Sequence, residues 1–84
     1  MLTLHVYVTA GCWGCTEAER LVAELRLHFP QVAMALLDLN VVPAPPNVFA
    51  TPTYVLNGRV IYLGNPRRAD LQQTLLDALA QSDA

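Results

Sequence analysis

The chain has 84 residues, of which 54% are hydrophobic, and this content lies above the roughly 45–50% of an average soluble protein. The composition excludes a disordered chain, and the length predicts one domain that spans residues 1–84. A net charge of −2, with no lysine and dispersed arginines, excludes a basic surface for nucleic acid. The longest uncharged segment, residues 39–58, contains four prolines and therefore does not predict a membrane-spanning helix.

The N-terminal segment is not typical of a secretory signal, because no basic residue precedes its first apolar positions and Cys12 follows soon after. We therefore expect a cytoplasmic protein. The two cysteines lie only three positions apart, and a loop this short stabilises a fold very little. The cysteine pair therefore indicates chemistry rather than a structural disulfide framework.

Residues 2–9 predict a β-strand. They alternate in polarity and are rich in β-branched and aromatic types, and Gly11 interrupts the pattern. One face carries Leu4, Val6 and Val8, and the other carries Thr3, His5 and Tyr7. We interpret His5 and Tyr7 as residues of the sheet rather than as catalysts.

The next segment predicts an amphipathic helix that begins at Cys15 and ends before Pro30. Apolar residues recur in it at spacings of three and four, namely Ala18, Leu21, Val22, Leu25 and Phe29. Residues 32–39 follow as a nearly continuous apolar run, which is typical of a strand buried on both faces of a sheet. A helix is the alternative for this run, and its shortness favours the strand.

Residues 40–51 contain three prolines, which predict a loop with at most one helical turn. Two runs with strand composition follow, residues 53–56 and 59–63. The dipeptide Asn57-Gly58 separates them, and it tolerates the two positive φ angles of a type I′ hairpin turn. The sequence therefore predicts a β-hairpin in this part of the chain.

The last segment predicts a second helix, with Asn65 as its cap and Pro66 at its first position. The helix is expected to end near Ala80. Its buried stripe is expected to consist of Leu71, Leu75, Leu76 and Leu79. The elements follow the order β-α-β and then β-β-α, without an internal repeat or a linker.

The motif Cys12-Trp13-Gly14-Cys15 lies at the junction of the first strand and the first helix. Unpaired N–H groups and the helix dipole favour an anion there, and this placement lowers a cysteine pKa from about 8.5 to roughly 3.5–7.5. Cys12, at the exposed end, is expected to attack a disulfide. Cys15, one turn inside the helix, is expected to resolve the mixed disulfide.

Two other interpretations of the cysteine pair stay open. Cys-X-X-Cys is half of a zinc site, but the remaining ligands would have to be His5 and His28, which lie on separate elements without paired spacing. Free cysteines also behave as small buried hydrophobes. The residue types and their spacing favour redox chemistry over both, with no metal and no cofactor expected.

The chain resembles the thioredoxin and glutaredoxin superfamily over nearly its whole length. Residues 4–15 resemble the glutaredoxin segment that leads into the active-site helix, and residues 51–58 resemble the thioredoxin cis-proline strand and hairpin. The two motifs together, in this order, are far more specific than either alone. The resemblance implies an α/β thioredoxin-like three-layer domain with a four-stranded mixed sheet (βαβ-ββα), in which the central family helix is reduced to the proline-rich loop.

The resemblance also implies roles for individual residues. Cys12 is expected to be the nucleophile, Cys15 the resolving thiol, and Pro52 the cis-proline that faces the disulfide. Thr51, which precedes this proline, is expected to hold the substrate backbone. An ordinary trans proline at the start of a strand is the alternative for Pro52. The expected substrate-binding residues are Trp13, Gly14, Thr51 and Pro52.

Trp13 and a pair of arginines have competing interpretations. Trp13 either faces solvent and contacts partner proteins, or packs against the proline loop. Arg67 and Arg68 either mark an anion-binding spot near the site or belong to a solvated helix face, and the second interpretation is favoured.

Three departures from the superfamily matter. Val6 stands where thioredoxins carry a buried aspartate that is thought to take the proton of the resolving thiol, so exchange is expected to be slower or to use water. Gly14 stands where thioredoxins have proline and glutaredoxins tyrosine, which leaves the reduction potential open. The missing helix leaves one side of the sheet thinly covered, and an exposed apolar surface there could recruit a partner or a second copy.

The sequence predicts a thiol-disulfide oxidoreductase that exchanges a dithiol for a disulfide on a disulfide-bearing protein or a small disulfide. The alternative is a non-catalytic thioredoxin-like adaptor that binds a partner through the cleft around Trp13 and Pro52 and uses the cysteines as a redox-sensitive clip. No nucleic-acid or membrane partner is expected, and the expected state is a monomer or a weak homodimer.

A thioredoxin-reductase-like or other dithiol electron donor is expected rather than glutathione. Glutathione carries two carboxylates and needs a cation near the cysteines. Thr9 and Ala10 stand where the glutaredoxin pattern has a lysine, and residues 50–52 are Ala-Thr-Pro instead of Thr-Val-Pro. Part of a glutathione site is still available from Asn65, Arg67 and Asp70.

Overall fold

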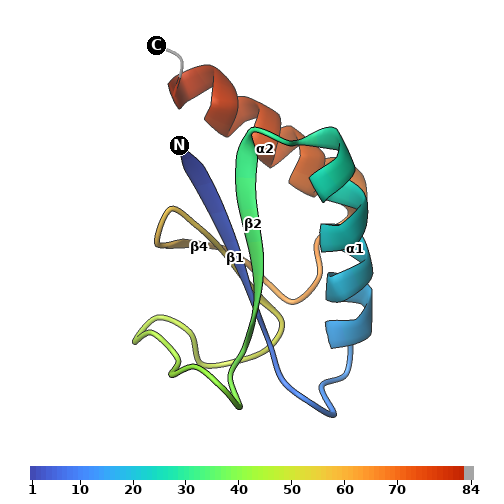
Figure 1. Cartoon of the computed structure of the whole chain (residues 1–84), viewed down its shortest axis with the longest axis vertical. Helices are drawn as coiled ribbons and strands as arrows, with labels where there is room; N and C mark the ends of the chain where they lie inside the picture. Colours follow the sequence, from blue (N-terminus) through green and yellow to red (C-terminus); the bar gives the residue numbers. More distant parts are fainter. Residues whose placement is uncertain (83–84) are drawn as a thin grey trace.

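Six elements, in the expected order, make up the computed structural model, which describes residues 1–82 (Figure 1). They are β1 (Leu2–Val8), α1 (Cys15–His28), β2 (Val32–Asp38), β3 (Thr53–Leu56), β4 (Arg59–Leu63) and α2 (Arg68–Ser82). The strands form one mixed sheet in the order β2-β1-β3-β4. β1 and β2 are parallel, and the other neighbouring pairs are antiparallel. Residues 83 and 84 of the expected domain lie outside the described part.

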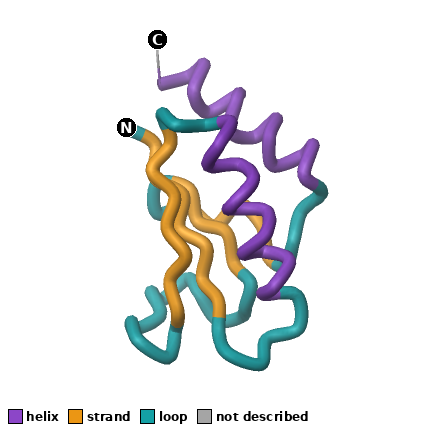
Figure 2. The backbone as a smooth tube through the Cα atoms, turned by 45° about the vertical axis from the view of Figure 1, so that its right-hand side comes forward, coloured by secondary structure: helices purple, strands orange, loops and turns teal. Residues whose placement is uncertain are grey.

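Both helices pack on the same face of the sheet, as Figures 1 and 2 show. Leu4 and Val6, on the predicted inner face of β1, are fully buried in one cluster with residues of both helices. The whole predicted stripe of α1 belongs to this cluster, from Ala18 to Phe29. The period of the apolar residues therefore predicted correctly which face of β1 and which side of α1 are buried.

α2 departs from the prediction at its start and in its stripe. It begins at Arg68, and Asn65 does not cap it; the Leu71 N–H donates to the Arg67 carbonyl at 3.0 Å instead. Leu76 is 51% exposed, because at 100° per residue it lies about 140° around the helix from the buried Leu71. No helix among residues 1–82 combines the length and the apolar character that crossing a bilayer requires.

The proline-rich loop between β2 and β3 covers part of the opposite face of the sheet. Val48 of this loop packs with Tyr7 and Val55 in a second, smaller buried cluster. The loop contains a turn at each end: the Val42 N–H donates to the Asp38 carbonyl at 2.9 Å, and the Val48 N–H donates to the Pro45 carbonyl at 2.9 Å. This arrangement confirms that a loop replaces the central family helix.

β2 is an edge strand, and the expectation that both of its faces are buried is wrong. Only Val32 of this strand is buried, and residues 34–37 are half-buried. The physical reason is its position, because β2 has one neighbouring strand and no described helix covers the second face of the sheet. At this open edge, the Arg26 Nη2 donates to the Met34 carbonyl at 2.8 Å.

The predicted hairpin between β3 and β4 is confirmed. Asn57 and Gly58 have φ angles of 50° and 82°, which are the two positive values that a type I′ turn needs. Asn57 also joins the hairpin to the start of β1, because its side chain accepts the Thr3 N–H at 2.8 Å and its own N–H donates to the Thr3 carbonyl at 2.9 Å.

Two leucines of α2 provide a test of the one-sided core. Replacing Leu71 with alanine is expected to lower the free energy of unfolding by about 2–5 kcal/mol, because the change leaves a cavity in the buried cluster. Replacing Leu76 with alanine is the matched control and is expected to change it by less than about 0.5 kcal/mol. Urea unfolding followed by far-ultraviolet circular dichroism measures both, and equal losses would contradict the assigned faces of α2.

Candidate active site

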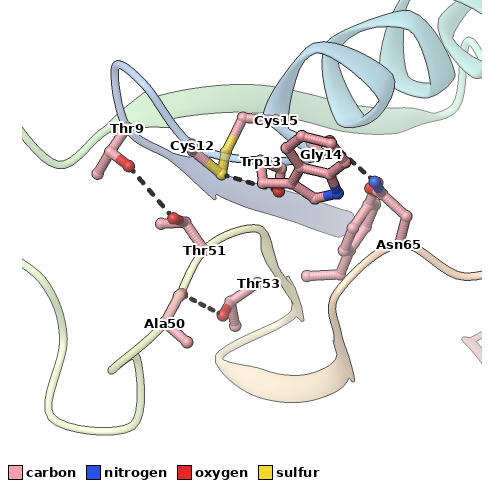
Figure 3. The surroundings of a disulfide bond; sticks show 10 residues. Thr9, Cys12, Trp13, Gly14, Cys15, Ala50, Thr51, Thr53 and Asn65 are labelled. Atoms are coloured by element: carbon pink, nitrogen blue, oxygen red, sulfur yellow. Dashed lines mark hydrogen bonds between the residues drawn. A yellow bond between two sulfur atoms is a disulfide. The ribbon is translucent and has the colours of Figure 1, made fainter.

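Cys12 and Cys15 lie where the end of β1 turns into the start of α1. Gly11 makes the turn with a φ of 71°, and α1 begins at Cys15 itself. The two cysteines form a disulfide, and their Cα atoms are 5.3 Å apart (Figure 3). Cys15 is 4% exposed, whereas Cys12 is half-buried, so Cys12 is the more accessible of the two residues.

The N-terminus of α1 has no side-chain cap and adjoins residues 12–15, which we call the cysteine loop. Gly14 is the N-cap residue and has a left-handed backbone (φ 94°, ψ −9°). As a glycine it has no side chain that could form a capping hydrogen bond. The Cys15 N–H donates to the Cys12 carbonyl at 3.3 Å. Unpaired N–H groups at a helix start attract negative charge, so this end of α1 stabilises a thiolate at Cys12 when the pair is reduced.

Pro52 lies against the cysteine loop from the side of β3. The Thr51–Pro52 peptide bond is cis, and Pro52 is buried. A Cβ atom placed on Gly14 would lie 4.0 Å from the Pro52 Cδ, so the two segments are in van der Waals proximity. Thr53 holds the start of β3 in place, because its hydroxyl donates to the Ala50 carbonyl at 2.6 Å.

Thr9 and Thr51 connect the end of β1 to the proline loop. Their hydroxyl oxygens are 3.2 Å apart, and Figure 3 shows the two side chains pointing toward each other beside Cys12. The fold therefore gathers Thr51, Pro52 and Gly14 around the disulfide, as expected for a shared site.

Trp13 points into solvent with 98% of its surface exposed, so the alternative in which it packs against the proline loop is wrong. Phe49 is a second exposed aromatic residue, at 79%, and it directly precedes Ala50. The sequence does not indicate that Phe49 is exposed, because exposure of an aromatic residue in a loop has no local signal. Both side chains offer apolar surface that the fold itself does not use.

The remaining candidates lie away from the disulfide or are already paired. The Arg68 Nη1 is 3.4 Å from the Glu24 Oε2, which joins α2 to α1 in agreement with a charged helix face. His5 and Tyr7 make an edge-to-face ring contact with centroids 6.2 Å apart. His28 ends α1, at the far end from Cys15. Within residues 1–82, no three His, Cys, Asp or Glu side chains form a group that could hold a metal ion.

A hydrogen-bonded chain runs from β3 to the cysteine loop, and the sequence does not predict it because Gly14 and Asn65 are 51 positions apart. The Tyr54 hydroxyl donates to the Asn65 Oδ1 at 2.8 Å. The Asn65 Nδ2 in turn donates to the Gly14 carbonyl at 2.8 Å, as Figure 3 shows. Burial raises the pKa of Tyr54 to about 12, and the charge of Glu17 acts in the same direction. Its hydroxyl therefore remains protonated at neutral pH.

No family model matches the sequence, and no curated protein matches it. Solved structures do resemble the fold. The thioredoxin from Trypanosoma brucei brucei superposes with a TM-score of 0.75 at 22% identity, over 95% of this chain and 76% of that chain. Oxidized mitochondrial thioredoxin 3 from Saccharomyces cerevisiae superposes with 0.73 at 21% identity, over 90% and 77%.

A third similar chain comes from a structure on thiol resolution in yeast mitochondrial 1-Cys peroxiredoxin by the glutathione and thioredoxin systems. Its TM-score is 0.74 at 20% identity, with coverage of 90% of this chain and 77% of that chain. The chain has the thioredoxin fold. Identities this low establish the fold and leave the reaction to the chemistry of the site.

A pocket of about 310 Å³ opens beside the disulfide of this thioredoxin fold. Its lining consists of Val8, Thr9, Ala10, Gly11, Cys12, Cys15, Thr16, Glu19 and Asp38. Glu19 and Asp38 are the charged members, so the pocket is acidic. Val6, by contrast, is fully buried in the core, so the position of the thioredoxin aspartate carries no charge here. A larger hollow of about 720 Å³ between β4 and α2 does not include the cysteines.

Replacing Gly14 with alanine is expected to destabilise the fold by more than the 1–2 kcal/mol or so of a left-handed non-glycine residue. The reason is steric, because the new Cβ would lie 3.2 Å from the Asn65 Nδ2. Gly58→Ala is the matched control, since its φ of 82° is similar and a Cβ there meets nothing within 4 Å. Urea unfolding of the oxidised proteins compares them, and equal losses would show that the contact with Asn65 contributes nothing.

Proposed function

We propose that the chain is a thiol-disulfide oxidoreductase that exchanges its Cys12–Cys15 dithiol with disulfides of proteins or small molecules. One observation carries the proposal: an accessible cysteine and a buried one, three positions apart, meet at an uncapped helix start in a thioredoxin fold. Unequal access is what a two-step exchange requires, because one thiol must meet the substrate while the other waits inside.

The exchange oxidises the two thiols of the protein and transfers two electrons to one substrate disulfide. The Cys12 thiolate attacks a substrate disulfide, a mixed disulfide forms, and one substrate thiolate leaves. The Cys15 thiol loses its proton to solvent and attacks the Cys12 Sγ, which forms the Cys12–Cys15 disulfide and releases the second substrate thiolate. Both substrate thiolates take up protons according to their pKa values, and a dithiol donor then returns the protein to its reduced form.

We assign substrate contacts to the segments around the disulfide. Thr51 and the cis Pro52 offer backbone beside Cys12, and the hydrogen bond with Thr9 keeps Thr51 in place. Trp13 and Gly14 lie between the two cysteines, and the exposed Trp13 ring suits an apolar side chain of a protein substrate. This set of contacts favours an extended protein segment over a small disulfide.

We also propose a protein dithiol as the electron donor, in a reducing compartment such as the cytoplasm. The pocket beside the disulfide contains Glu19 and Asp38 and no arginine. Glutathione carries two carboxylates, so like charge disfavours its approach there, whereas a dithiol protein needs no such pocket. The charge of the pocket therefore agrees with the absence of the glutaredoxin lysine from the sequence.

The division of labour between the cysteines can be tested by trapping. Cys15→Ser is expected to accumulate a mixed disulfide with a substrate protein, because Cys12 still attacks and no thiol resolves the product. Cys12→Ser is the matched control and is expected to trap at most a tenth as much, because the remaining Cys15 is buried. Non-reducing electrophoresis measures the adducts, and equal trapping by the two variants would contradict the roles.

Insulin reduction in the presence of dithiothreitol separates an oxidoreductase from the adaptor alternative. The wild-type chain is expected to accelerate the turbidity that marks insulin reduction, and Cys12→Ser is expected to fall to the uncatalysed rate. A non-catalytic adaptor would instead bind oxidised and reduced partners with different affinities and give no turnover above background. Absence of turnover in the folded, reduced wild-type protein would therefore reject the proposed activity.

The donor is tested by supplying reducing equivalents in two forms. A thioredoxin reductase system with NADPH is expected to reduce the Cys12–Cys15 disulfide at least tenfold faster than millimolar glutathione, because the acidic pocket repels the smaller anion. Glu19→Gln together with Asp38→Asn is expected to raise the rate with glutathione and to leave the reductase rate nearly unchanged. Rapid and saturable reduction of the wild-type protein by glutathione would contradict the proposal and identify glutathione as the electron donor, as in glutaredoxins.

A further inference from the structure

We propose that Asn65 is a positioning residue that sets the redox equilibrium of the cysteine pair, an inference that rests on the proposed function. It does so by holding the Gly14 carbonyl, between the two cysteines, from outside the cysteine loop. The bond spans 51 positions of the sequence, so it restrains the loop against the body of the fold rather than within itself.

Hydrogen-bond chemistry orients the whole chain of contacts in one way. The Gly14 carbonyl can only accept, so the amide nitrogen of Asn65 must face it. The Oδ1 of Asn65 then faces Tyr54, whose hydroxyl must donate. Tyr54 is fully buried in β3, between β1 and β4, and is therefore a rigid anchor. Asn65 itself is exposed, so its amide depends on Tyr54 for its orientation.

The segment that Asn65 holds is conformationally flexible by itself. Glycine has no Cβ and reaches many backbone conformations, and Gly14 adopts the left-handed region as the uncapped N-cap of α1. The helix restrains the same carbonyl from the other side, because the Ala18 N–H donates to it at 3.1 Å. Asn65 therefore supplies a tertiary hydrogen bond to the residue that precedes Cys15.

Loss of the Asn65 amide affects the oxidised and the reduced cysteine loop to different extents. A disulfide closes the loop covalently, so removing the Asn65 amide frees the oxidised loop very little. The reduced loop has no such closure, and without Asn65 the Gly14 backbone gains conformational freedom that disulfide formation must take away again. Loss of the amide therefore disfavours the disulfide and makes the potential more positive, and the same sign holds if the bond is stronger in the oxidised state.

The equilibrium to measure is that of the protein dithiol with glutathione disulfide, which yields the protein disulfide and two glutathione molecules. Asn65→Ala is expected to lower its constant three- to tenfold, which corresponds to a potential about 15–30 mV more positive at about 30 mV per tenfold. Tyr54→Phe removes the orienting hydroxyl and is expected to shift the constant in the same direction by a smaller factor.

Asn47 provides a matched control away from the cysteines. It is exposed, and its Nδ2 donates to the Gly58 carbonyl at 3.2 Å, so Asn47→Ala removes the same kind of bond to a glycine carbonyl. This variant is expected to keep the wild-type potential. A merely structural role for Asn65 would lower the unfolding free energy of the oxidised and reduced proteins equally and leave the potential unchanged.

A potential of Asn65→Ala that equals that of Asn47→Ala, or that is more negative than wild type, would overturn the proposal. Should Asn65→Ala fail to fold, Tyr54→Phe and Asn65→Ser carry the same test. The outcome is separable from that of the proposed function, because the potential is measured on the cysteine pair alone. An Asn65-dependent potential without insulin turnover supports the positioning role and rejects the oxidoreductase activity. Insulin turnover with an unchanged potential supports the activity and rejects the positioning role.

Discussion

β1 is buried beneath both helices, and this packing positions the other elements and the cysteines. Leu4 and Val6 share one cluster with Leu25 of α1 and Leu71 of α2, and all four are fully buried. Full burial of such a side chain stabilises the fold by about 1.5–3 kcal/mol. Because β1 leads into the cysteine loop and α1 begins at Cys15, the packing that fixes β1 against α1 also fixes where the two cysteines meet.

On the second face of the sheet, a loop completes the core, and no helix within residues 1–82 covers this face. Val48 covers Tyr7 and Val55 from a loop, and the prolines of that loop restrict its unfolded conformations, so ordering it loses less entropy. The same loop then delivers Thr51 and Pro52 to the disulfide. One segment therefore closes the core and builds half of the candidate site, while the edge strand β2 stays half-buried.

Two electrostatic influences of opposite sign act on negative charge near Cys12 and Cys15. The uncapped start of α1 favours negative charge at Cys12, and this effect is local because it falls off within the first turn of a helix. Glu19 and Asp38 make the neighbouring pocket acidic, which disfavours a small anionic thiol. Under the proposed function, a protein substrate avoids this conflict if it approaches over the exposed Trp13 with neutral backbone and apolar side chains.

Features that depend on residues close together in the chain could be predicted from the sequence alone. Alternation predicted the inner face of β1, a spacing of three and four predicted the stripe of α1, and two residues that tolerate positive φ predicted the hairpin at Asn57 and Gly58. The position of Cys12 and Cys15 at a strand-to-helix junction followed from the same local patterns.

Features whose partners are distant in the sequence depend instead on how the elements pack together. Asn65 has the local signal of a helix cap, yet its amide bonds to Gly14, 51 positions away, because the fold brings that carbonyl within reach. The exposure of Trp13 and Leu76 depends on which surfaces the neighbouring elements cover. Local propensity is the same wherever the partner lies, so only the packed chain shows which of two available hydrogen bonds or faces is used.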